Sequence, residues 1–211
     1  MQSRTRVRRH PERGVYDAET VHAILDEGMI AHVGFVDGET PVVIPTAYGR
    51  DGASMYLHGS AVALWSKRMA EGVPVCVTVT LFDGLVLARS TFKHSMNYRS
   101  VMIFGNAVLV SDSQEKLHGL ERIVEHLVPG RSREARGPNE TELTATSVLR
   151  LSLAESSAKI RSGGPLDDDA DFSRPVWAGV LPAAVTYGTP VPDALVPPIV
   201  SPPDYIRLYE R

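Results

Sequence analysis

The chain has 211 residues, of which 43% are hydrophobic and 22% are charged, and its formal net charge is −3. This composition excludes wholesale disorder and collagen-like repeats, and a chain of this length can bury a core of its own. The charge is unevenly distributed, because residues 1–13 hold five Arg and one Glu, a charge of +4, which leaves −7 on the rest.

An acidic body argues against binding to nucleic acid, so we interpret the basic arm as a solvated tail rather than a phosphate-binding segment. No apolar run approaches the roughly 18 residues of a membrane span, and no apolar segment follows the Arg-rich start. We therefore expect a cytoplasmic protein that binds no membrane. The single cysteine, Cys76, lies in an apolar run and is interpreted as a buried core residue.

The first predicted element is an amphipathic helix over residues 18–27, capped by Asp17 and ended by Gly28. Short segments rich in β-branched and aromatic residues follow, and they predict strands. These strands cover residues 29–36, 41–48, 54–58, 73–82 and 85–90. Three of the breaks between strands contain Asp-Gly, which predicts a β-hairpin because it accepts positive φ. The Asp-Gly pairs are at residues 37–38, 51–52 and 83–84.

One helix interrupts these strands over residues 61–71, with Ser60 as its cap. A long strand over residues 98–110 follows, then a helix over residues 114–128 and a last strand around residues 149–153. Six or seven strands with few helices predict a mainly β protein, a small closed β-barrel with accessory helices, because closure removes unpaired strand edges.

The composition changes after residue 160, where Gly, Asp and Pro become frequent, and residues 181–203 hold seven of the fifteen prolines. Such a segment cannot form an interior strand or helix, so we predict an extended arm that wraps the barrel or a neighbouring subunit. A disordered tail is the alternative. The predicted anchors are Trp177, Tyr205, Ile206 and Leu208. The predicted divisions are a basic arm (1–14), a barrel domain (15–160) and a C-terminal arm (161–211).

Several common catalytic and binding motifs are absent from the sequence. It contains no GxGxxG, GxxxxGK[ST], HExxH, CxxC or GxSxG, and its histidines lack the spacing of metal ligands. Dinucleotide folds, P-loops, zinc proteases, thioredoxins and α/β-hydrolases therefore have no support, and no metal site is predicted.

A first polar segment lies where a predicted strand ends and a helix begins. His58, Gly59 and Ser60 offer a hydroxyl, free backbone N–H groups and the positive end of a helix dipole, which together suit a phosphate. Lys67, further along the same helix, would add a point charge. An ordinary serine cap with an exposed lysine is the alternative.

Two further segments carry unusual polarity. Residues 89–100 join two strands and hold four basic side chains, counting His94, and five hydroxyls, counting Tyr98, which suits an anionic ligand, with a solvated loop as the alternative. Pro45 lies within a predicted strand, and because proline lacks a ladder donor it belongs on an edge or at a bulge. The backbone there could border a flat heterocycle.

These segments occur in an order that resembles the pyridoxamine 5′-phosphate oxidase-like, flavin-nucleotide-binding split-barrel family, and most closely its nitroimidazole-resistance-like branch. The resemblance covers about residues 15–180. It is carried by Pro-x-x-x-Pro-Thr-x-Tyr (41–48), Tyr-Leu-His-Gly-Ser (56–60), Pro-Val-Cys-Val-Thr-Val (74–79), Asp-Gly-Leu-Val-Leu-Ala-Arg-Ser (83–90), Asn-Tyr-Arg-Ser-Val (97–101), Phe-Gly (104–105) and Trp-Ala-Gly-Val-Leu-Pro (177–182).

The resemblance implies a six-stranded antiparallel split barrel that forms a homodimer, with one FMN in each of two clefts at the subunit interface. By position, Ile44, Pro45 and Thr46 would edge the isoalloxazine. His58, Gly59 and Ser60, with Lys67, would lie near the ribityl phosphate. The set would be completed by Asn97, Arg99, Ser100 and Trp177.

The function implied is that of an FMN-dependent oxidoreductase acting on a small-molecule substrate, with the catalytic residue unassigned and His94 as a candidate. The chain has Leu64-Trp65 where many relatives have Arg-Lys, and it lacks the C-terminal Arg signature of true pyridoxamine phosphate oxidases, so vitamin B6 oxidation is not expected.

Three alternatives remain. They are a reductase that uses a deazaflavin, a haem-binding or haem-degrading split barrel with His94 as the axial ligand, and a non-enzymatic flavin-binding protein. For Arg99, which enters an apolar strand, we predict a phosphate contact rather than a structural pair with a carboxylate.

Overall fold

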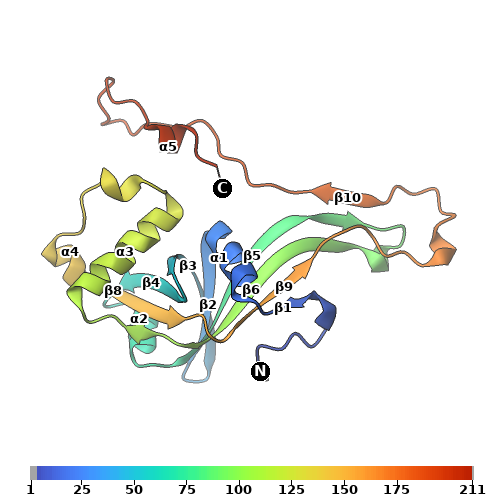
Figure 1. The fold of residues 1–211 in the computed structure, drawn as a ribbon, viewed down its shortest axis with the longest axis horizontal. Coiled ribbons are helices and arrows are strands. Elements are labelled where there is room, and N and C mark those ends of the chain that lie inside the picture. Colours follow the sequence, from blue (N-terminus) through green and yellow to red (C-terminus); the bar gives the residue numbers. More distant parts are fainter. Residues whose placement is uncertain (1–3, 211) are drawn as a thin grey trace.

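The computed structural model of the chain describes residues 4–210 (Figure 1). Its strands are β1 (Gly14–Val15), β2 (Ile30–Asp37), β3 (Thr40–Asp51), β4 (Ser54–Ser60), β5 (Pro74–Leu87), β6 (Ser95–Asn106), β7 (Val108–Leu109), β8 (Thr146–Ser152), β9 (Ser156–Arg161) and β10 (Gly179–Pro182). Its α-helices are α1 (Ala18–Glu27), α2 (Leu64–Ala70), α3 (Ser113–Leu127), α4 (Glu140–Ala145) and α5 (Asp204–Arg207). Four short 3-10 turns are η1 (Pro11–Arg13), η2 (Thr91–Lys93), η3 (Arg131–Arg133) and η4 (Asp169–Asp171). The mainly β class is confirmed.

The strands pair antiparallel in the order β1-β9-β6-β5-β2-β3-β4-β8-β7, and β10 adds to β5. The described residues thus form ten strands rather than the six expected, because short strands from both arms and from residues 108–109 extend the edges. No helix among the described residues is long and apolar enough to cross a membrane.

The core lies between the inner sheet faces and α1, which contacts β5, β6 and β9. Alternation along the strands supplies it, since every second residue of a strand points to the same face. Its largest fully buried side chains include Leu25, Tyr48, Met55, Leu57, Met69, Ile103, Leu149 and Leu151. On the outside, α3 packs against β3 and β4 with Ile123 buried.

Two of the three predicted hairpins are confirmed. The turns after Asp37 and Asp51 join β2 to β3 and β3 to β4, with Gly38 at φ 61° and Gly52 at φ 53°. The prediction at Asp83-Gly84 is wrong, because β5 continues through it and pairs with β6 on both sides of a bulge. Gly84 has φ 146°, and a Cβ there would lie 2.6 Å from the carbonyl oxygen of Leu181 in β10.

Two helix N-caps were predicted, and one of them forms. The Asp17 cap of α1 is confirmed, since Asp17 Oδ1 accepts a hydrogen bond from the Thr20 N–H at 2.8 Å. Ser60 is not a helix cap, because β4 continues to pair with β8 up to Ser60, and α2 begins only at Leu64 after Ala63. Strand β9 was not predicted, and it forms by pairing with the free edge of β6.

Both arms lie against the barrel. The prediction of a solvated N-terminal tail is wrong for the described part, since Arg4 forms an ion pair with Glu155, Thr5 is buried and β1 pairs with β9. The C-terminal arm continues through β10 to α5 (Figure 1), whose Tyr205 contacts Arg131 and Glu134 beyond the end of α3. Of the predicted anchors, Tyr205 contacts Glu134 at 2.6 Å, whereas Trp177 and Leu208 are both exposed.

Candidate functional site

The central feature of the site is a fork between β3 and β4. The two strands pair only from Tyr48 opposite Leu57 to Asp51 opposite Ser54. Beyond Tyr48, residues 40–47 of β3 pair with β2 alone, and beyond Leu57, residues 58–60 of β4 pair with β8 alone. The facing edges of these segments have no strand partner in the described chain, so their backbone groups are free to bind something else.

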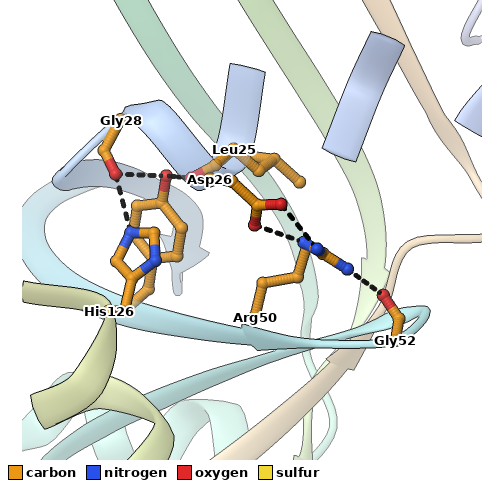
Figure 2. A network of polar contacts seen from close by, with 7 residues as sticks. Leu25, Asp26, Gly28, Arg50, Gly52 and His126 are labelled. Atoms are coloured by element: carbon orange, nitrogen blue, oxygen red, sulfur yellow. Dashed lines mark hydrogen bonds and ion pairs between the residues drawn. The ribbon is translucent and has the colours of Figure 1, made fainter. Parts of the chain in front are cut away.

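The base of the fork is fixed to the end of α1 by a polar network (Figure 2). The Tyr48 hydroxyl lies 2.5 Å from the Leu25 carbonyl and 2.9 Å from the Gly28 carbonyl, and His126 Nε2 of α3 lies 2.7 Å from the same Gly28 oxygen. These groups satisfy carbonyls at the helix end that have no partner inside the helix. Nearby, Arg50 forms a bidentate ion pair with Asp26 and also contacts the Gly52 carbonyl.

Sequence-predicted residues lie on both sides of the fork. Ile44, Pro45 and Thr46 lie in the half of β3 that has a free edge, which agrees with the edge position expected for a proline in a strand. His58, Gly59 and Ser60 lie in the diverging half of β4. The structure therefore brings these two predicted groups to one fork.

Helix α2 packs on the β4 side of the fork and leaves buried polar atoms unsatisfied. A Cβ on Gly59 would lie 2.3 Å from the Trp65 ring, so only glycine allows this approach. His58 Nδ1 and Ser66 Oγ are buried without a hydrogen-bond partner among the described residues. Burial lowers the pKa of His58, so its imidazole is neutral at pH 7. Lys67 is exposed and has no ion-pair partner in the described chain.

The three predicted residues of β6 serve other partners. Arg99 Nη2 lies 2.7 Å from both Asp83 Oδ1 and Glu27 Oε1, and hydrogen bonds to these carboxylates raise the pKa of the Arg99 guanidinium. The phosphate contact predicted for Arg99 is therefore corrected to a structural double ion pair. Asn97 is buried and accepts a hydrogen bond from Arg161, and the Ser100 hydroxyl contacts the Lys159 carbonyl at 3.3 Å.

The donor-rich segment 89–100 is not a single loop. Its second half belongs to β6, and its first half is held by the C-terminal arm. Asp167 accepts the Arg89 backbone N–H at 2.8 Å and the Arg89 guanidinium at 2.9 Å, while Lys93 pairs with Asp168 at 2.8 Å. The acidic arm therefore pairs with two of the four basic residues, Arg89 and Lys93, that were predicted to await an anionic ligand.

Two predicted residues remain apart from the fork. Trp177 precedes β10 and is 66% exposed, so it approaches no other predicted residue within the described subunit. His94 follows η2 and lies in the lining of a cavity of about 780 Å³. Among residues 4–210, no group of three or more His, Cys, Asp or Glu side chains could hold a metal ion.

Comparisons with known proteins agree with this architecture. A family model described as pyridoxamine 5′-phosphate oxidase matches residues 17–160. The chain belongs to this family. Among solved structures, the flavocytochrome Anf3 from Azotobacter vinelandii is 41% identical with a TM-score of 0.93, and the match covers 99% of this chain and 97% of that one. No curated protein matches the chain.

Two further structures show how far the family likeness extends. The FAD and haem binding protein from Mycobacterium smegmatis is 34% identical with a TM-score of 0.89, over 93% of this chain and 96% of that one. A structure assigned as a 5-nitroimidazole antibiotic resistance protein from Bacteroides thetaiotaomicron is 22% identical with a TM-score of 0.58, over 70% and 86% of the two chains. The last likeness is one of fold alone, whereas the first two matches cover nearly the whole chain.

Some lining residues of the cavity at His94 were missed by the sequence analysis. Arg9, Arg13, Lys159 and Arg161 come from the N-terminal arm and from β9, neither of which was predicted to fold here. The concentration of arginine in residues 1–13 was the available signal.

Proposed function

We propose that this chain binds a flavin and a haem and acts as a homodimeric oxidoreductase on a small molecule. The observation that carries the proposal is its likeness, over nearly the whole chain, to a flavocytochrome and to an FAD and haem binding protein. Of the two flavin nucleotides we propose FAD rather than the FMN implied by the sequence motifs, because the serine cap that would favour a terminal phosphate is not formed at Ser60.

The fork fits a flavin by the chemistry of its residues. The free edge at Ile44, Pro45 and Thr46 would border the ring system, and the unpartnered His58 Nδ1 offers a polar atom beside it. On the other side, Ser60 and the unpaired Lys67 would approach the phosphates. Buried polar atoms without partners are costly in a folded chain, and a ligand that satisfies them removes this cost.

Bound flavin supplies hydride or single-electron transfer, and bound haem supplies single-electron exchange. The chain's own residues would bind and orient these groups and exclude water from them. His58 is suited to this role, because a neutral imidazole can either accept or donate a hydrogen bond at Nδ1 without placing a charge in a half-buried site.

The homodimer is supported by the C-terminal arm. Its apolar side chains are largely uncovered in the subunit, with Val191 90%, Leu195 89% and Ile199 91% exposed. Exposure of this kind over one extended segment is unfavourable in water and marks a surface that another chain covers. A second copy would also offer a surface against which Trp177, exposed in the single subunit, could pack.

A fluorescence titration with FAD, FMN and riboflavin tests the flavin assignment. We expect both nucleotides to bind at least tenfold more tightly than riboflavin, since each charge-assisted phosphate contact is worth roughly 1.5–3 kcal/mol. The variant Lys67→Gln should reduce this preference, and the matched variant Lys116→Gln, on α3, should not. Equal affinity for all three flavins would contradict the assignment of the phosphate to this fork.

A further inference from the structure

The cavity that contains His94 has a strongly cationic lining. It measures about 780 Å³ and lies between the N-terminal arm, the segment after η2, and strands β6 and β9. Five of its residues are Arg or Lys, and its lining includes no Asp or Glu. The cationic residues are Arg9, Arg13, Lys93, Lys159 and Arg161.

Three of these cations have no carboxylate partner among residues 4–210, and one of the three, Arg161, is held by neutral acceptors. Arg13 lies 3.8 Å from Glu12, Lys93 pairs with Asp168, and Arg161 donates to carbonyl oxygens and to Asn97. Arg9 and Lys159 have no carboxylate within ion-pair distance among residues 4–210. A neighbouring cavity of about 220 Å³ shares Arg9 and Lys159 and adds Arg6 and Arg8 from the arm.

In a chain with net charge −3, such a cluster of unpaired cations is electrostatically costly unless an anion occupies it. The N-terminal arm nevertheless folds back to create the cluster, although a solvated tail would avoid the repulsion. The lining therefore favours a ligand that carries negative charge.

Four further residues of the lining are apolar and exposed. Phe92 is 89% exposed, Leu166 72%, Met96 50% and Leu85 44%. A flat apolar ligand would cover these side chains and gain roughly 25 cal/mol for each Å² removed from water. Together with the cations, this describes a flat apolar molecule with anionic groups at one edge.

His94 adds a possible metal ligand to the same lining. Its Nδ1 lies 2.9 Å from the Ser90 carbonyl oxygen, which can only accept, so Nδ1 carries the proton and Nε2 keeps a free lone pair. A backbone carbonyl that orients the ring in this way is the usual arrangement around metal-bound histidines.

We infer that this cavity is the haem site, with His94 as an axial ligand of the iron and with Arg9 and Lys159 pairing the carboxylates of the porphyrin edge. The inference rests on the proposed function, and it adds the location, the iron ligand and the residues that select a porphyrin with free carboxylates. Figure 1 shows that the N-terminal arm, which supplies Arg9, lies against β9, the strand that supplies Lys159.

The test uses the full chain titrated with haemin and, separately, with haemin dimethyl ester, whose carboxylates are masked. The double variant Arg9→Gln with Lys159→Gln should bind haemin at least tenfold more weakly than the wild type, and the dimethyl ester should bind equally to both. The matched double variant Lys116→Gln with Arg133→Gln removes the same charge elsewhere and should change neither affinity.

A second arm tests the iron ligand. His94→Ala should lose the absorption spectrum of imidazole-bound haem, and free imidazole should restore it, whereas His10→Ala, at the other histidine of the lining, should keep it. Circular dichroism shows whether each variant is folded. If the double variant is not folded, the single variant Arg9→Gln, at an exposed position, replaces it in the haemin titration.

The outcomes separate this inference from the proposed function. If the wild type binds no haemin, the haem part of the proposed function fails. If the wild type binds haemin and all cavity variants bind it unchanged, the location is wrong and the function stands. If the cationic variants weaken FAD and not haemin, the cavity holds a pyrophosphate and the inference is overturned.

Discussion

Arg99 illustrates how a single residue acquires its role from partners distant in the sequence. Its guanidinium lies between Asp83, on the neighbouring strand β5, and Glu27, at the end of α1. The arrangement ties the end of the helix to the sheet. Because the side chain is about one-third exposed, water screens part of the attraction between these charges.

We expect Arg99→Ala to lower the free energy of unfolding of the cofactor-free protein by about 1 kcal/mol, because two partly screened ion pairs are lost. Flavin affinity should change less than threefold, since the guanidinium is already occupied. Urea denaturation and a flavin titration measure the two quantities. A tenfold loss of flavin affinity at unchanged stability would restore the phosphate role that the sequence suggested.

Tyr48 closes the base of the fork, and its hydroxyl contacts carbonyls at the end of α1. Tyr48→Phe should destabilise the protein by about 1–3 kcal/mol, because those buried carbonyls lose a donor that water cannot replace. Thermal unfolding of the cofactor-free protein measures the change. The control Tyr16→Phe alters an exposed hydroxyl and should have a clearly smaller effect; equal effects would contradict the account.

At the scale of elements, the C-terminal arm acts as a latch on the segment that carries His94. Burial acts to raise the pKa of Asp167, but hydrogen bonds from the Arg89 backbone and guanidinium outweigh it and hold the pKa below its ordinary value of 3.8. A carboxylate with a depressed pKa stabilises the folded arrangement above its ordinary pKa, and this contribution is lost as the pH falls through the depressed value.

Asp167→Ala should therefore loosen the arm at neutral pH, and chymotryptic cleavage after Phe172 should become roughly three- to tenfold faster because both hydrogen bonds of the carboxylate are lost. Asp167→Asn keeps one acceptor and should give an intermediate rate. In the wild type, protection should persist down to pH 4 and decline below it, as followed by hydrogen exchange. Identical cleavage rates in all three proteins would show that the latch contributes nothing.

Local chemistry predicted the elements whose partners are near in sequence. Asp17 caps α1 and the first two Asp-Gly turns form because each depends on residues a few positions away. The third Asp-Gly pair becomes a bulge because β10, about a hundred residues later, lies across Gly84. Strand β9 was missed for the same reason, since the edge of β6 determines its conformation.

At the scale of the whole molecule, the fork was predictable and the cationic cavity was not. Ile44 to Thr46 and His58 to Ser60 carry their polarity in short motifs, and the separation of β3 from β4 brings them together. The cavity depends on the N-terminal arm, which packs against β9 although its arginines repel one another. The arginines of residues 1–13 indicate the charge of this segment but not the path that it takes.

The uncovered apolar residues of the C-terminal arm lead to a prediction for the assembly. We expect light scattering to give twice the 23.0 kDa mass of one chain. Replacing Val191, Leu195 and Ile199 by serine should shift the protein toward the monomer, because these side chains would no longer gain from being covered. Serine replacements of the exposed β2 and β3 residues Val36 and Val43 are the control. A monomeric wild type would contradict the homodimer.

The central claim is that one chain holds both a flavin and a haem. The most direct test is the absorption spectrum of the protein after it is loaded with FAD and haemin together and dialysed extensively. The account predicts flavin bands and a Soret band that both persist, at about one of each cofactor per subunit. A dialysed protein that retains neither cofactor, or only one of them, would contradict it.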